Sequence, residues 1–220
     1  MPVPFDLRLY LVTDRPLAGA RGVVATVEAA IAGGVTLVQV RSPDATGRAF
    51  VEEARALKAV LAPHAIPLIV NDRIDVALAV GADGVHVGQS DIDPIAARQM
   101  LGPDAIIGLS VGSEVEWTAS RAMLAAVDYL GTGPAFTTAT KANAGQAIGC
   151  RGLSEMVTRG SLPIVAIGGI GAQSVADVMA TGVDGIAVVS AIMAANDPQA
   201  AARDLRARVD AAILSRSTRS

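Results

Sequence analysis

The feature that most limits the possible folds is a regular alternation of two kinds of segment along the 220 residues. Short β-branched runs alternate with alanine-rich amphipathic stretches. Strands are expected at Leu9–Thr13, Thr36–Arg41, Pro67–Val70, Gly84–Val87, Ala105–Leu109, Val127–Gly131, Ile164–Ile167 and Gly185–Val188. Helices are expected at Val23–Ala32, Gly47–Leu61, Ile74–Val80, Pro94–Leu101, Glu114–Ala125, Leu153–Arg159, Ser174–Ala180 and Gln199–Leu214. This order predicts a single α/β domain closed into a (β/α)8 TIM barrel, with an open doubly wound sheet as the alternative.

Composition agrees with a barrel and excludes several classes of protein. Hydrophobic residues make up 51% of the chain and aromatic residues 3%, which is typical of parallel strands buried on both faces. A net charge of −3 gives no sign of a nucleic-acid or membrane surface. Cys150 is the only cysteine, and the first residues lack the pattern of a secretory signal. We expect a cytoplasmic protein with one domain over residues 1–220, whose leader (1–7) and tail (215–220) are loosely ordered.

One local pattern occurs twice. Gly81-Ala82-Asp83-Gly84 resembles Gly182-Val183-Asp184-Gly185, and each reads as a helix end, a tight turn and a strand start. The repeat is either one helix-to-strand joint used twice or convergent turn chemistry. Both explanations predict the same local structure.

Polar residues recur at the carboxyl ends of the expected strands, where the active site of a TIM barrel lies. The polar residues are Gln39 and Arg41, Asn71 and Asp72, His86 to Asp91, Ser110, the threonine-rich segment to Lys141, and Ser190. Strand ends seven and eight also carry Gly168, Gly169 and Val189, which offer backbone groups. Core packing does not account for so many polar strand ends around one rim. They predict a binding site there.

The segment Gly131–Lys141 and the last two strand ends suggest phosphate binding. Threonine hydroxyls and backbone N–H groups can surround phosphate oxygens, and Lys141 adds a positive charge. The turns at Gly168-Gly169 and Val189-Ser190 occupy the usual phosphate position of such barrels. The alternatives are a threonine-rich surface loop and ordinary turn glycines.

The charged strand-end residues each have two interpretations. Asp72 and Asp91 suit Mg²⁺ shared with a phosphate, or they cap the helices that follow. Arg41 needs an anionic partner, which is a ligand phosphate or a carboxylate such as Asp72. His86 is expected to be a polar strand-end residue and not a base, because no paired nucleophile is evident.

Taken together, these residues resemble the thiamine-phosphate synthase family from about Leu9 to the final helix. The matching motifs are Leu9–Asp14, Gln39-Val40-Arg41, Asn71-Asp72, Gly84–Gln89 with Asp91, Gly108-Leu109-Ser110, Gly133–Lys141, Ile167–Ile170 and Val189–Ile192. Several of them are common in phosphate-binding barrels, but their order and joint presence are specific.

The resemblance implies a transferase of thiamine biosynthesis that joins hydroxymethylpyrimidine pyrophosphate to a thiazole phosphate and releases pyrophosphate. It implies Mg²⁺ on Asp72 and Asp91, and Gln39 near the pyrimidine. Gly169, Val189 and Ser190 would take the thiazole phosphate. Arg41, Asn71, Ser110, Thr138, Thr140 and Lys141 would surround the phosphorylated ends, with Arg41, Ser110 and Lys141 as the catalytic set. It also implies a homo-oligomer, and a pyrimidine carbocation stabilised by charge and positioning, without a general base.

One position departs from the family pattern. Pro43 stands where the family carries a lysine expected to contact pyrophosphate, and loss of such a contact costs on the order of 2–4 kcal/mol of transition-state stabilisation. Arg15 is a candidate substitute. The rival readings are a thiazole tautomerase, a sugar-phosphate epimerase or isomerase of the same fold, and a non-catalytic barrel that binds thiamine precursors.

Overall fold

The computed structural model describes residues 4–138, 145–160 and 162–218. Its strands form a closed parallel barrel in which each strand pairs with its neighbours in sequence and β1 pairs with β8. The strands are β1 (Leu9–Val12), β2 (Leu37–Val40), β3 (Leu68–Asn71), β4 (Gly84–Val87), β5 (Ile106–Ser110), β6 (Tyr129–Thr132), β7 (Ile164–Ile167) and β8 (Gly185–Val188). The predicted (β/α)8 TIM barrel is confirmed, and the open sheet is excluded.

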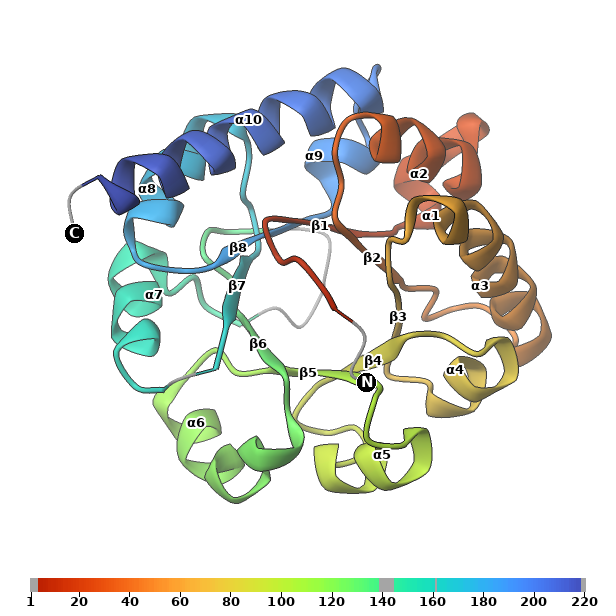
Figure 1. Ribbon diagram of the computed structural model, residues 1–220, viewed down its shortest axis with the longest axis horizontal. Helices are drawn as coiled ribbons and strands as arrows, with labels where there is room; N and C mark the ends of the chain where they lie inside the picture. Colours follow the sequence, from red (N-terminus) through yellow and green to blue (C-terminus); the bar gives the residue numbers. More distant parts are fainter. Residues whose placement is uncertain (1–3, 139–144, 161, 219–220) are drawn as a thin grey trace.

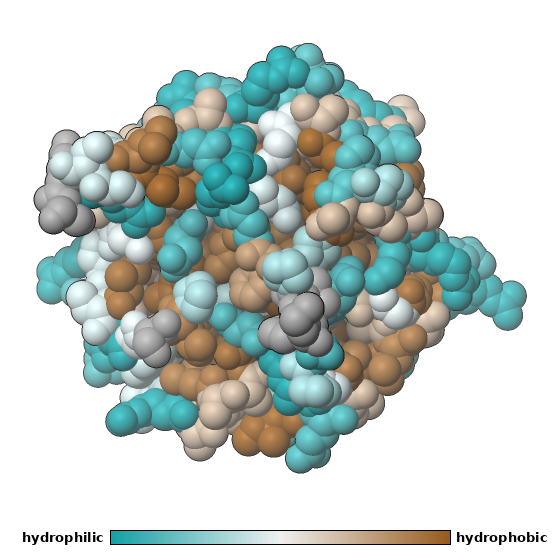
Figure 2. Space-filling view, in the orientation of Figure 1, coloured by the Kyte–Doolittle hydropathy of each residue, from teal (hydrophilic) through white to brown (hydrophobic). Residues whose placement is uncertain are grey.

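Helices surround the strands as an outer ring (Figure 1). They are α1 (Arg15–Ala18), α2 (Val23–Ala32), α3 (Gly47–Leu61), α4 (Ile74–Val80), α5 (Pro94–Leu101), α6 (Glu114–Ser120), α7 (Gly149–Val157), α8 (Val175–Ala180), α9 (Ser190–Met193) and α10 (Pro198–Ser217). No described helix is long and apolar enough to cross a membrane. Hydrophilic residues form most of the outer margin in the space-filling view, with hydrophobic residues in the gaps between them (Figure 2).

The expected element bounds are confirmed where local signals are strong. Helices α2 to α5 and strands β4, β7 and β8 have the predicted limits. Asp93 caps α5, because its carboxylate accepts hydrogen bonds from the N–H groups of Ile95 and Ala96, and a proline occupies the first turn.

The expected bounds are wrong where tertiary contacts decide. Helix α7 begins at Gly149 and not at Leu153, because the N–H groups of Ile148 and Gly149 donate to the carbonyls of Pro134 and Ala135 after β6. Helix α6 ends at Ser120 and continues as a 3-10 helix over Arg121–Ala126. The short helices α1 and α9 were not expected. Helix α10 runs to Ser217, past the expected end at Leu214.

Two hydrophobic clusters lie inside and outside the strand ring. The outer cluster packs the strands against the helices. The inner cluster contains Leu7, Tyr10, Val12, Leu37, Ile69, Ile106, Tyr129, Val165 and Ala187. Phe5 packs against it, with its ring centroid 5.8 Å from that of Tyr129. The N-terminal segment accordingly crosses the centre of the ring in Figure 1.

The amino end of the barrel repeats one hydrogen bond four times. A side chain just before each even-numbered strand accepts the N–H of a residue at or next to the start of the preceding odd-numbered strand. The pairs are Thr36 with Leu9 (3.0 Å), Asp83 with Leu68 (2.9 Å), Asp128 with Ile107 (2.7 Å) and Asp184 with Ile164 (2.7 Å). The predicted likeness of the Asp83 and Asp184 joints is confirmed, and it extends to Asp128.

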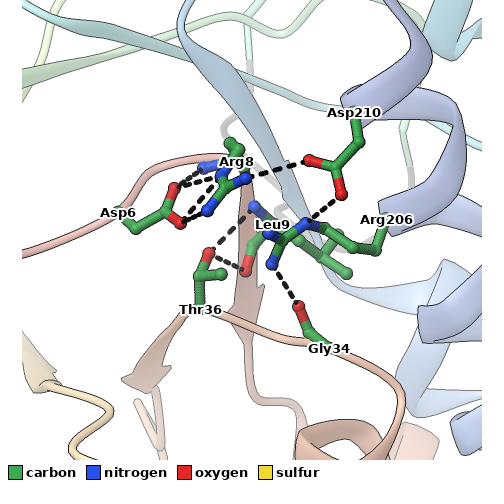
Figure 3. A network of polar contacts seen from close by, with 7 residues as sticks. All are labelled: Asp6, Arg8, Leu9, Gly34, Thr36, Arg206 and Asp210. Carbon is green, nitrogen blue, oxygen red and sulfur yellow. Dashed lines mark hydrogen bonds and ion pairs between the residues drawn. The ribbon is translucent and has the colours of Figure 1, made fainter. Parts of the chain in front are cut away.

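A polar network joins the two ends of the chain at this amino end (Figure 3). Arg8 contacts the carboxylates of Asp6 and Asp210 at 2.6 and 3.1 Å. Arg206 on α10 in turn binds Asp210 and the Gly34 carbonyl. Helix α10 is thereby attached to the leader and to the segment that enters β2.

Candidate active site

A cavity opens at the carboxyl ends of the strands, at the predicted rim. Eight of the proposed site residues line it: Gln39, Arg41, Asn71, Ser110, Thr138, Gly169, Val189 and Ser190. Val12, Val165, Ile167, Ala187 and Val188 give it an apolar wall on β7, β8 and β1. Asp72 and Asp91 are not among the lining residues, and Thr140 and Lys141 lie outside the described residues. The cavity therefore has a polar wall on β2 to β5 and an apolar wall opposite.

Arg41 supplies a positive charge to this cavity. Its backbone N–H donates to the hydroxyl of Thr13 at 3.0 Å, just beyond the end of β2. Among the described residues, the half-buried guanidinium forms no ion pair. Asp72 is not its partner, so that alternative is wrong. A half-buried guanidinium facing a cavity favours an anionic ligand.

Asp72 follows β3 in an unusual backbone conformation. Its φ is 59°, in the left-handed region, which costs a residue other than glycine about 1 kcal/mol or more. Its backbone N–H donates to the carbonyl of His86 at 2.9 Å, and its carboxylate accepts the Asn71 amide at 2.6 Å. Arg73, not Asp72, occupies the N-cap of α4, so Asp72 does not cap that helix.

Asp91 closes the turn that follows β4. Its carboxylate accepts the N–H of Gly88 at 2.7 Å, while Asp93 caps α5. The helix-cap interpretation is therefore wrong for both aspartates. No cluster of three or more metal-binding side chains occurs within residues 4–138, 145–160 and 162–218, so a cation here would need ligands beyond these two carboxylates.

His86 has a hydroxyl partner that the sequence did not reveal. Its Nε2 lies 2.9 Å from Oγ of Ser110, and its Nδ1 lies 3.0 Å from the hydroxyl of Tyr129. The expectation that His86 has no paired nucleophile is therefore wrong, while the expectation that it is not a base stays a prediction. The third group is a phenol and not a carboxylate, so the arrangement is not that of a hydrolytic triad.

Two tyrosines complete the polar wall inside the barrel. The hydroxyls of Tyr10 and Tyr129 are 2.9 Å apart, and Nε2 of Gln39 lies 2.7 Å from the Tyr10 hydroxyl. Burial raises the pKa of both phenols, so each keeps its proton. Sequence reasoning missed both residues. The available signal was their rarity, because they are the only tyrosines in the chain.

The glycines after β7 are required by the chain that follows β6. Gly168 and Gly169 have φ of 99° and 64°. A Cβ on Gly169 would lie 2.7 Å from the Thr137 carbonyl oxygen, and one on Gly168 would lie 2.6 Å from Cα of Pro134. Close packing of residues 134–137 thus adds a reason for glycine to the expected approach of a phosphate.

The loop after β2 carries no lysine contact. Pro43 is exposed on a turn. Arg15, the candidate substitute, pairs with the buried carboxylate of Glu53, which also accepts the Ser42 hydroxyl at 3.2 Å. The charge of Arg15 is therefore balanced by a neighbouring carboxylate.

Known proteins resemble the chain along almost its whole length. The family model described as thiamine monophosphate synthase matches residues 9–192. The thiamine-phosphate synthase of Xanthobacter autotrophicus is 59% identical over 96% of this chain and 100% of its own length. That of Azorhizobium caulinodans is also 59% identical, over 96% of this chain and 98% of its own.

Solved structures agree. A thiamine phosphate pyrophosphorylase from Pyrococcus furiosus superposes with a TM-score of 0.85 at 39% identity, covering 94% of this chain and 97% of that one. A 3-hexulose-6-phosphate synthase, at 20% identity and a TM-score of 0.66, shares the fold alone. The cavity, the barrel and these full-length matches together lead to one assignment: the chain belongs to the thiamine monophosphate synthase family.

Proposed function

We propose that the carboxyl-end rim binds hydroxymethylpyrimidine pyrophosphate and the thiazole phosphate side by side and joins them with release of pyrophosphate. Family membership makes the chain an enzyme of thiamine biosynthesis that forms thiamine phosphate. The tautomerase and precursor-binding alternatives are not favoured by relatives of this identity. The likeness to the hexulose-phosphate enzyme supports no sugar-phosphate activity, because it extends only to the fold.

The polar wall is the proposed binding site of the pyrophosphate. The observation that carries this proposal is the half-buried Arg41 guanidinium, which faces the cavity and forms no ion pair with a described residue. Asn71, Ser110 and Thr138 line the same cavity and supply amide and hydroxyl groups. We expect Thr140 and Lys141 to act with them. These groups stabilise the negative charge that grows on the leaving pyrophosphate.

The apolar wall is the proposed seat of the thiazole. Val165 and Ile167 of β7 and Ala187 of β8 offer an apolar surface for its ring. Gly169, Val189 and Ser190 line the cavity beyond them and supply backbone N–H groups and a hydroxyl for its phosphate. Holding the thiazole nitrogen against the pyrimidine carbon converts the condensation into a reaction between positioned partners.

Mg²⁺ is the proposed cofactor, held by Asp72 and Asp91. The two carboxylates follow neighbouring strands, and Asn71 and Gly88 orient them through hydrogen bonds. Two protein carboxylates suit Mg²⁺, which takes its remaining ligands from water and from phosphate oxygens. When bound, the ion would neutralise charge on the pyrophosphate as it leaves.

The test is a thiamine phosphate assay with both phosphorylated precursors and Mg²⁺, run on the protein and on Pro43→Lys. We expect product from the parent chain, loss of product on chelation, and recovery on adding Mg²⁺ back. Pro43→Lys should raise kcat/KM, because it adds a positive charge where Arg15 is already paired. Absence of product from both proteins would contradict the proposal, and turnover that resists chelation would contradict the Mg²⁺ site.

A cytoplasmic location and a homo-oligomeric state stay predictions. Cys150 is half-buried. Sedimentation of the purified protein with and without substrates would measure the oligomeric state.

A further inference from the structure

We infer that the hydrogen-bonded chain Gln39–Tyr10–Tyr129–His86–Ser110 has one direction, and that this direction decides which atoms Gln39 and Ser110 offer to the substrate. Tyr10, Tyr129 and His86 are then positioning residues for substrate specificity. The inference rests on the proposed function only where it names the substrate.

The chain is continuous from one side of the cavity to the other. Its four hydrogen bonds measure 2.7, 2.9, 3.0 and 2.9 Å in the order given. Gln39 is on β2 and Ser110 ends β5, and both line the cavity. The tyrosines lie between them, and both side chains are buried in the interior of the barrel, where a hydrogen bond is stronger than in water.

The direction follows from the number of protons each group carries. The Gln39 amide nitrogen can only donate, so the Tyr10 oxygen accepts a hydrogen bond from it. The single hydroxyl hydrogen of Tyr10 is then donated in a hydrogen bond to the Tyr129 oxygen. Tyr129 then has its own proton left for Nδ1 of His86. Nδ1 is thereby an acceptor, and the imidazole carries its hydrogen on Nε2.

The last bond of the chain sets the state of Ser110. The Nε2–H of His86 donates to the Ser110 oxygen, so the serine hydroxyl proton is left for the cavity. At the other end, one N–H of the Gln39 amide is bonded to Tyr10, and the amide oxygen Oε1 is left as an acceptor. The cavity therefore offers an acceptor from β2 and a donor from β5.

The neighbouring backbone is shaped around this chain. A Cβ on Gly108 would lie 2.4 Å from Nδ1 of His86 and 2.4 Å from the Tyr129 hydroxyl. A Cβ on Gly131 would lie 2.8 Å from Cε1 of His86. Such contacts are too short for any residue but glycine. Two interior strand positions are thus kept free of side chains where the His86 and Tyr129 rings meet.

The resulting pattern matches an aminopyrimidine. Its exocyclic amino group donates and its ring nitrogen accepts, which complements the Gln39 oxygen and the Ser110 hydroxyl. The 4-oxo analogue presents the reverse pattern, with a carbonyl acceptor and a ring N–H donor. A buried chain with the opposite direction would select the analogue, because a mismatched end leaves a polar group unpaired.

The first test measures the direction without any catalysis. Nitrogen-15 NMR at one neutral pH reports which imidazole nitrogen carries the hydrogen, and the chain has only two histidines. His64 is exposed in a short 3-10 helix and serves as an internal reference, assigned with His64→Asn. We expect the nitrogen-15 shifts of His86 to report a single Nε2–H tautomer in the parent protein. In Tyr129→Phe, these shifts should move toward those of the exposed reference His64. An Nδ1–H tautomer or an imidazolium in the parent protein would overturn the inference.

The second test measures selectivity. We expect the ratio of kcat/KM for the aminopyrimidine pyrophosphate to that for its 4-oxo analogue to fall about tenfold in Tyr129→Phe and in Tyr10→Phe. The two variants interrupt the hydrogen-bonded chain at different residues. If one of them fails to fold, the other still gives the measurement. Phe5→Leu is the matched control, because Phe5 packs on the Tyr129 ring but has no hydroxyl, and its ratio should not change.

The outcomes separate this inference from the proposed function. An unchanged ratio of kcat/KM values in both folded tyrosine variants would overturn the specificity role. An equal fall of this ratio in Phe5→Leu would also overturn it, because packing and not the hydroxyl groups would then explain the effect. If the parent protein makes no product from either pyrimidine, the proposed function fails. The NMR result would still decide the direction of the chain.

Discussion

Aspartates at the two ends of the barrel face opposite circumstances. At the amino end, Asp83, Asp128 and Asp184 each accept an N–H from the neighbouring strand, and Asp83 and Asp128 also pair with a cation. At the carboxyl end, Asp72 and Asp91 are exposed. Asp72 keeps a left-handed φ of 59°, and its carboxylate accepts a hydrogen bond from a neutral amide, that of Asn71.

The difference separates stability from function within one residue type. An aspartate that accepts a strand N–H adds to the free energy of unfolding, because the N–H would otherwise lose its partner. The strained conformation of the exposed Asp72 adds no stability, and the proposed binding of a cation would account for it. Substitutions at the two ends should therefore change different measurements.

The largest effect is expected for Asp72→Asn. Asparagine tolerates the left-handed conformation and matches the shape of aspartate, so only the charge is removed. We expect kcat/KM for thiamine phosphate formation to fall by about 10²–10³-fold. The melting temperature should stay within about 2 °C of the parent.

Raised Mg²⁺ gives this prediction a second measurement. The Mg²⁺ concentration needed for half-maximal rate should increase in Asp72→Asn, since one of the two proposed carboxylate ligands is lost. A fall in melting temperature with unchanged kcat/KM would show that Asp72 stabilises the fold as the amino-end aspartates do. That result would contradict the assignment of different roles to the two ends of the barrel.

The next effect concerns the amino end. Asp128→Ala should lower the free energy of unfolding by about 2–3 kcal/mol, because the Ile107 N–H loses its side-chain acceptor and Arg98 loses its ion pair, keeping only its hydrogen bonds to backbone carbonyls. Asp184→Ala should cost less, about 1–2 kcal/mol, because it loses the Ile164 N–H bond and Asp184 forms no ion pair with a described residue. Urea unfolding measures both.

Two further readings sharpen the amino-end prediction. Asp44→Ala is the surface control, since Asp44 is exposed on the turn after β2, and it should leave unfolding unchanged. At a temperature where the variants are folded, kcat should equal that of the parent. A loss of kcat in Asp184→Ala comparable to that in Asp72→Asn would contradict the division between the ends.

The smallest effect depends on pH and involves Asp6. Burial raises the pKa of this carboxyl, but the hydrogen bonds and charge of Arg8 outweigh burial and hold the pKa below its ordinary value of 3.8. A lowered pKa stabilises the folded state above the unfolded pKa, and that contribution is lost as pH falls through the folded pKa. Asp6→Asn should therefore cost about 0.5–1 kcal/mol at neutral pH.

The difference between the parent and Asp6→Asn should narrow as pH falls below 3.8, where the parent carboxylate takes up its proton. Urea midpoints at a series of acidic pH values measure it. A difference that is constant across that series would mean that Arg8 contributes through packing and not through charge.

Local sequence signals were sufficient for the barrel and for most of the rim. Alternating segments and caps such as Asp93 are encoded within a few residues, so they predicted the fold and many bounds. The rim residues Gln39, Arg41 and Ser110 were found because a barrel places every strand end at one edge. Both predictions need only the order of elements along the chain.

What the sequence did not reveal depends on contacts between distant strands. The pairing of His86 with Ser110 and Tyr129 joins β4, β5 and β6, and no spacing rule along the chain reports it. The early start of α7 depends in the same way on carbonyls after β6. The ion pair of Arg15 with Glu53 joins α1 to α3 across a turn.

The hydrogen bond that is repeated four times at the amino end predicts where new termini can be placed in the polypeptide. It joins β1 to β2, β3 to β4, β5 to β6 and β7 to β8, each even strand supplying the acceptor. Among the residues described, the repeat does not cross from β2 to β3, from β4 to β5 or from β6 to β7. The barrel is in this sense four two-stranded modules. A circular permutation with new termini in the exposed turn around residues 62–65, between β2 and β3, would leave every module whole, whereas one that opens the chain between β3 and β4 would divide the module closed by Asp83.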